Sequence, residues 1–72
     1  MDERIDLFSK FGGIRPMARK LSAAVGTVNS WKRARRIPAP WQPRVLRVAQ
    51  ELGIDVTAED VMFPFPADRM PA

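Results

Sequence analysis

Cysteine and histidine are both absent from this chain. Without cysteine there can be no disulfide and no thiolate metal site, and without histidine the usual nitrogen ligand, general base and pH switch are missing. These absences exclude a zinc finger. No apolar run approaches the ~20 residues that cross a bilayer, and no signal-peptide core follows the charged N-terminus. We therefore expect a cytoplasmic protein with no membrane partner.

The side-chain sets that build catalytic sites are missing as well. Ser9, Ser22 and Ser30 have no histidine to act as their base, and Glu59 and Asp60 are adjacent in the sequence, so their side chains point apart. We therefore expect that the protein is not an enzyme and that it uses no cofactor and no metal.

Acidic residues are confined to the two ends of the chain. Between Asp6 and Glu51 there are ten Lys or Arg residues and no Asp or Glu, although the net charge of the whole chain is only +4. This placement indicates one positive face on the folded protein. A basic surface on a small protein can also be no more than a solvated face, and that alternative stays open at this point.

The first half of the chain contains start and stop signals for three helices. Asp2 or Glu3 can begin the first helix, and Gly12 and Gly13 end it. Pro16 suits the first turn of a second, two-turn helix that buries Met17, Ala18 and Leu21. A turn over 22–24 leads to a third helix over about 25–33, with Val28 and Trp31 on its buried side.

The second half has two further helical segments. Pro38 and Pro40 place a loop over 35–40, and Pro43 suits the first turn of a fourth helix that Gly53 ends. Residues at helical spacing form its apolar face: Trp41, Val45, Val48, Ala49 and Leu52. A cap at Thr57 predicts a short fifth helical turn through about Met62. We expect Met62 and Met17 to be core residues.

These signals predict an all-α fold, a small helix-turn-helix domain of four helices plus a short fifth helical turn. We place the domain at residues 1–63 and a flexible, proline-rich C-terminal tail at 64–72. The segment Phe63–Pro66 leaves two alternatives, because its phenylalanines can pack back on the domain or form an extended binding segment.

The run from Ile14 to Arg33 resembles the helix-turn-helix of the lambda-repressor and Cro-like superfamily. The fuller run from Phe11 to Pro38 resembles small Cro-like or YdaS-like phage and prophage regulators, and the likeness covers about residues 3–62. The family needs a small residue where Ala18 stands and apolar residues where Leu21, Val28 and Trp31 stand. The departure is Ser22, where the family usually has glycine in a left-handed turn, at a cost of about 1 kcal/mol for any other residue.

The resemblance implies that the third helix enters the major groove of duplex DNA. Base readout is then expected from Val25, Gly26, Asn29, Ser30 and Arg33. Phosphate contacts are expected from Arg15, Lys20, Thr27, Lys32, Arg35 and Arg36.

The expected function is therefore that of a transcriptional regulator that binds double-stranded DNA as a homodimer, because one module of this size contacts few base pairs. Two alternatives stay open. The scaffold can be an adaptor that docks on RNA polymerase or another regulator through the helix-four surface or the Phe63–Phe65 segment. The chain can also be the DNA-binding fragment of a longer regulator.

Overall fold

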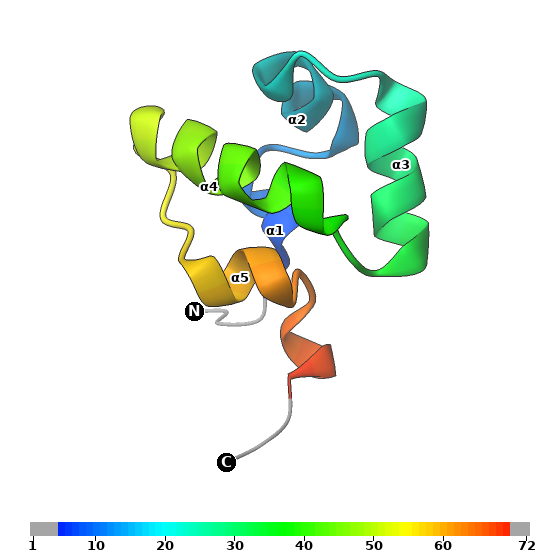
Figure 1. Cartoon of the computed structure of the whole chain (residues 1–72), viewed down its shortest axis with the longest axis vertical. Helices are drawn as coiled ribbons and strands as arrows, with labels where there is room; N and C mark the ends of the chain where they lie inside the picture. The colour runs from blue at the N-terminus through cyan, green and yellow to red at the C-terminus, as the bar shows by residue number, and fades with distance from the viewer. Residues whose placement is uncertain (1–4, 70–72) are drawn as a thin grey trace.

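The computed structural model describes residues 5–69, which form five α-helices and two short 3-10 helices and contain no strand. The helices are α1 (Leu7–Lys10), α2 (Ile14–Leu21), α3 (Val25–Ala34), α4 (Gln42–Glu51) and α5 (Ala58–Met62), with η1 (Ala39–Trp41) and η2 (Pro66–Asp68). α2 contacts α1, α3 and α4, whereas α5 packs on α4 (Figure 1). The predicted all-α fold with a helix-turn-helix is thereby confirmed.

The first helix begins later than the sequence predicted. Asp6 is its N-cap, since the Asp6 carboxylate accepts a hydrogen bond of 2.8 Å from the Ser9 backbone N–H. Ile5 lies before the helix and is 47% exposed. The predicted start at Asp2 or Glu3 is therefore wrong, because Ile5 and Asp6 would then be helical. Residues 2 and 3 themselves lie outside the described part of the chain.

The turn between α2 and α3 lies over residues 22–24, where the sequence predicted it. Ser22 ends α2 in the left-handed conformation, with φ 57° and ψ 41°. The turn is closed by the Ala23 backbone N–H, which donates to the Ala18 carbonyl at 2.9 Å. Ala18 is 1% exposed where α2 crosses α3. A serine holds the position that glycine usually takes, at a cost of about 1 kcal/mol.

One apolar core lies between the helices. Its members come from all five α-helices and from the loops: Leu7, Phe8, Phe11, Met17, Ala18, Leu21, Val28, Trp31, Ile37, Val45, Ala49, Val56 and Val61. Two predicted core residues are exposed instead, Leu52 by 52% and Met62 by 53%, whereas the predicted Trp41 and Val48 are partly buried and pack against the core. Leu52 and Met62 stand where their helices end, so the helical spacing that we extrapolated to them no longer applies.

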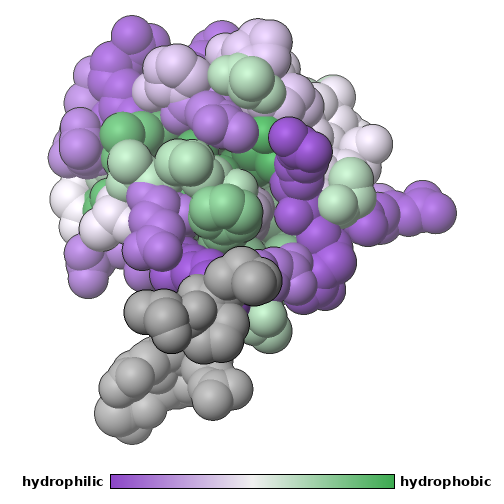
Figure 2. Space-filling model, turned by 60° about the horizontal axis from the view of Figure 1, so that its bottom comes forward, coloured by the Kyte–Doolittle hydropathy of each residue, from purple (hydrophilic) through white to green (hydrophobic). Residues whose placement is uncertain are grey.

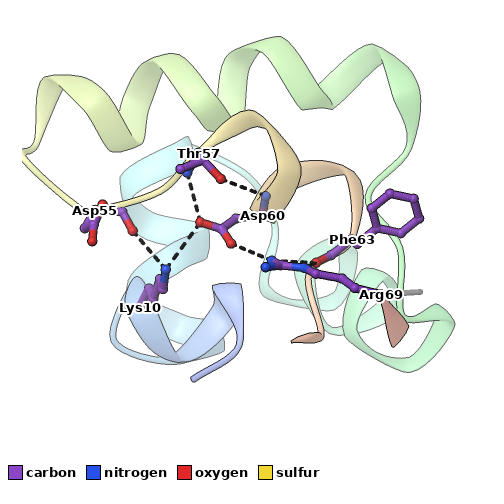
Figure 3. Close-up of polar contacts among 6 residues, drawn as sticks. All are labelled: Lys10, Asp55, Thr57, Asp60, Phe63 and Arg69. Atoms are coloured by element: carbon purple, nitrogen blue, oxygen red, sulfur yellow. Dashed lines mark hydrogen bonds and ion pairs between the residues drawn. The ribbon is translucent and has the colours of Figure 1, made fainter. Parts of the chain in front are cut away.

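A polar cluster around Asp60 joins α1, α5 and the C-terminal segment (Figure 3). Asp60 and Thr57 form a capping box at the start of α5. Lys10 binds the Asp60 carboxylate at 3.3 Å, and Arg69 binds its other oxygen. Burial alone would raise the pKa of Asp60, but the hydrogen bonds from Thr57, Arg69 and Lys10 lower it to about 2.

We expect the Asp60 cluster to make the stability of the domain sensitive to acid. The pKa is lowered from 3.8 to about 2 on folding, so the ionised carboxylate contributes about 2 kcal/mol at neutral pH. This contribution is complete above the ordinary pKa and is lost as the pH falls from about 5 to about 2. Urea unfolding across that range should show the loss, and Asp60→Asn should remove it.

Asp55→Asn is the matched control for that measurement, because the Asp55 side chain is exposed and only its backbone carbonyl accepts from Lys10. It should keep the acid sensitivity of the wild-type protein. An acid profile for Asp60→Asn that parallels the wild type would contradict the assignment.

The C-terminal segment packs on the domain as far as Arg69. The Leu7 backbone N–H donates to the Pro64 carbonyl at 2.9 Å, Pro64 is buried, and the Phe65 ring lies 5.6 Å from the Phe8 ring. Of the two alternatives for Phe63–Pro66, packing back on the domain therefore holds for Pro64 and Phe65, whereas Phe63 is exposed. The predicted division into a domain ending at residue 63 and a flexible tail does not describe residues 64–69, and residues 70–72 lie outside the described part.

Candidate nucleic-acid interface

The two sides of α3 differ completely in burial. Val28 and Trp31 are 0% and 4% exposed and pack inward. All five predicted base-readout residues are exposed: Val25, Gly26, Asn29, Ser30 and Arg33. At about 100° per residue, these five span about 140° of the helix circumference, opposite the buried pair. α3 stands at the edge of the molecule with its outer side clear of the other elements (Figure 1).

The exposed side of α3, which carries the five predicted base-readout residues and is called the readout side below, contains one residue with no role in the fold, Gly26. Gly26 lies in the first turn of the helix, where its φ is ordinary and a Cβ atom would meet nothing within 4 Å. Glycine lowers helix stability by up to about 1 kcal/mol relative to alanine. Neither packing nor backbone conformation therefore explains a glycine here, and its one structural effect is to expose the helix backbone.

The N-termini of α2 and α3 are both uncapped. Gly13 and Ala24 stand at their N-cap positions without a side-chain hydrogen bond, and neither first turn contains an acid. By contrast, α1 and α5 are capped by the side chains of Asp6 and Thr57. The free N–H groups and helix dipoles of α2 and α3 therefore keep their partial positive charge, which favours an anion.

The predicted phosphate-contact residues fall into two groups. Arg15, Lys32 and Arg36 are exposed, and no acid within residues 5–69 forms an ion pair with them. The other three have contacts within the domain: Lys20 donates to the Phe11 carbonyl at 3.3 Å, Thr27 is half-buried, and Arg35 binds Asp68. Hydrogen bonding to Asp68 raises the pKa of Arg35.

The structure adds Arg44 to the basic residues near α3. The Trp41 ring lies 5.1 Å from the ring of Trp31 in α3, and the Arg44 guanidinium lies 5.1 Å from the Trp41 ring. An exposed arginine of α4 thus lies beside the tryptophan pair that packs on the buried side of α3. One signal in the sequence pointed to Arg44, because it lies in the stretch of chain without acids. Its position relative to α3 could not be predicted, because a proline-containing loop separates the two.

An apolar groove lies between α4, α5 and η1, with a volume of about 360 Å³. It is lined by Ala39, Gln42, Pro43, Leu46, Ala58, Val61 and Met62. Next to Met62, Phe63 is 44% exposed. Figure 2, which brings the lower side of Figure 1 forward, shows apolar side chains gathered in the middle of that face with hydrophilic ones around them.

Within residues 5–69, no group of His, Cys, Asp or Glu side chains could hold a metal ion. None of the helices there is long and apolar enough to cross a membrane.

Comparisons with known proteins identify no relative. No family model, no curated protein and no solved structure matches this chain.

Proposed function

We propose that this protein is a transcriptional regulator that binds double-stranded DNA sequence-specifically, with α3 in the major groove. One observation carries the proposal. The exposed side of α3 carries Asn29 and Arg33, an amide and a guanidinium that can each recognise a base, and its backbone is exposed at Gly26. This helix also lies in a stretch of chain without acids. A merely solvated helix would need neither the glycine nor the exclusion of acids.

Different side chains of α3 would each recognise a different base. Asn29 pairs with adenine and Arg33 with guanine, because each can form two hydrogen bonds to the major-groove edge of that base. Val25, which is 43% exposed, contacts a thymine methyl group. Ser30 accepts several bases, and Gly26 lets the helix approach the DNA closely.

The basic residues around α3 fix the position of the DNA. Arg15, Lys32 and Arg36 meet phosphates directly, with Lys20, Thr27 and Arg35 beside them, and Arg44 extends this surface onto α4. The uncapped N-terminus of α2 adds a further attraction for phosphate. The protein binds a pseudo-palindromic site as a homodimer, since one recognition helix contacts too few base pairs for useful selectivity.

The sequence resemblance to Cro-like and YdaS-like regulators supports this proposal, and so does the left-handed conformation of Ser22 where that family usually has glycine. A regulator of this class acts in the cytoplasm of a bacterium, including one that carries a phage or prophage.

We expect the phosphate contacts to set the salt dependence of DNA binding. Arg15→Ala, Lys32→Ala and Arg36→Ala should each weaken binding to all sequences alike. Each should also reduce the slope of log affinity against log salt concentration by about 1, because one phosphate contact releases about one counterion. Fluorescence anisotropy with a labelled duplex, repeated at several salt concentrations, measures that slope.

Arg47→Ala is the matched control for these variants. Arg47 is also an exposed arginine and lies on α4, outside the predicted contact set. Its loss should leave the slope close to the wild-type value. An unchanged slope in the Arg15, Lys32, Arg36 triple variant would rule out the phosphate assignment.

The groove between α4 and α5 favours a second candidate function, an adaptor that docks on another protein such as RNA polymerase. Salt separates the two functions, because apolar docking does not weaken steeply with salt whereas phosphate binding does. An adaptor would also leave duplex DNA unbound at low salt.

A further inference from the structure

The side chain of Arg35 contacts the C-terminal segment. Arg35 ends α3 in the left-handed conformation, with φ 60°. Its Nε and Nη2 atoms donate to the two carboxylate oxygens of Asp68 at 2.8 and 3.1 Å. Its guanidinium also lies 4.1 Å from the centre of the Phe65 ring. The contact between Arg35 and Asp68 is therefore bidentate, the geometry in which guanidinium groups hold anions best.

Asp68 is presented to Arg35 by a segment that is anchored independently of this ion pair. On one side of Asp68, Phe65 packs on Phe8. On the other side, Arg69 binds the Asp60 carboxylate and donates to the Phe63 carbonyl (Figure 3). The ion pair itself lies at the surface, with the side chains of Arg35 and Asp68 50% and 39% exposed. It can therefore open while the segment stays in place.

Asp68 neutralises one charge of a dense basic group at the end of α3. Four basic residues follow one another closely there: Lys32, Arg33, Arg35 and Arg36. Within residues 5–69, Arg35 is the one of these four that forms an ion pair. The carboxylate thus sits beside the proposed DNA surface, where a negative charge opposes the approach of phosphate.

We propose that the Asp68 carboxylate competes with DNA phosphates for the Arg35 guanidinium. Asp68 binds Arg35 in the free protein, and a phosphate displaces Asp68 when duplex DNA binds. This inference rests on the proposed function. The Nε and Nη2 edge of Arg35 must release the carboxylate before that edge can bind a phosphate in the same way. Asp68 therefore lowers the affinity for DNA. Arg35 becomes available to a phosphate only when DNA is bound.

Asp68→Asn tests the proposal, with Asp55→Asn as the control that makes the same change of net charge. Figure 3 shows Asp55 on the far side of Asp60 from Arg69, and the Asp55 side chain is exposed. At about 0.1 M salt, Asp68→Asn should bind duplex DNA about five- to tenfold more tightly than wild type, with a slope of log affinity against log salt that is steeper by about 1. Asp55→Asn should leave the slope unchanged.

Two further variants keep the test independent of folding effects. In an Arg35→Ala background, Asp68→Asn should leave the salt slope nearly unchanged and raise the affinity only slightly, through the loss of one nearby negative charge, because the residue that it frees is gone. Asp68→Glu keeps the charge and should bind DNA with nearly the wild-type slope. Thermal melting of Asp68→Asn should stay within a few degrees of wild type, since the pair is exposed.

Two outcomes would overturn the inference, and they are distinguishable. If the wild type binds DNA with the expected salt dependence but Asp68→Asn behaves like Asp55→Asn, the competition is absent and the proposed function stands. If the wild type binds no duplex DNA even at low salt, the proposed function and the competition both fall.

Discussion

Trp31→Ala should cost about 3–5 kcal/mol of folding free energy, the usual loss when a buried tryptophan is truncated. Trp31 is 4% exposed, and its ring packs 5.1 Å from that of Trp41. A domain of this size has a total stability of only about 5–10 kcal/mol, so the variant should lose roughly half of its stability. Urea denaturation followed by circular dichroism measures the loss.

Trp41→Ala is the matched control, because the Trp41 ring belongs to the same pair but is only half-buried. It should destabilise the domain less than Trp31→Ala. A Trp31→Ala protein that melts within a few degrees of the wild type would show that α3 does not depend on this side chain for its position.

Arg33→Ala and Asn29→Ala should each cost about 1–3 kcal/mol of affinity on the preferred DNA site. Both side chains are exposed on the readout side of α3, one helical turn apart, so they should address neighbouring base pairs. Asn29→Ala should leave non-specific binding nearly unchanged, because a neutral amide releases no counterion. Arg33→Ala should weaken both.

The measurement is the affinity for every single-base variant of a site selected from genomic fragments. Wild type and Asn29→Ala should differ at one base pair. Gln50→Ala is the matched control, since Gln50 is an exposed amide on α4, outside the proposed interface. Equal losses for Asn29→Ala at all positions, or none at any, would mean that Asn29 reads no base.

The parts of the fold that could be predicted are those that local chemistry determines. Pro43 lies in the first turn of α4 and Thr57 caps α5, each as the sequence indicated. These signals act through the backbone within one helical turn, so they need no knowledge of the tertiary structure.

The errors fall where distant parts of the chain decide the outcome. Leu52 continues the apolar spacing of α4, but it stands at the C-cap of that helix and is 52% exposed. The segment after Phe63 contains prolines that suggested a flexible tail, yet its backbone bonds to Leu7 and its Phe65 ring packs on Phe8. A sequence pattern does not contain such contacts, because they join residues at opposite ends of the chain.

The candidate site shows the same division. Helical spacing predicts which residues of α3 face outward, since Val28 and Trp31 fix the buried side. It does not predict that Arg35 is held by Asp68, because the two residues are 33 positions apart.

The Asp60 cluster has a consequence for folding kinetics. Lys10 and Asp60 are 50 residues apart, so their contact closes a long loop at a cost in chain entropy. α2 and α3 are joined by a short turn and can pair early. Contacts that form after the folding transition state affect mainly the rate of unfolding. Removing the Asp60 carboxylate should therefore shorten the lifetime of the folded domain and leave the rate at which it folds nearly unchanged.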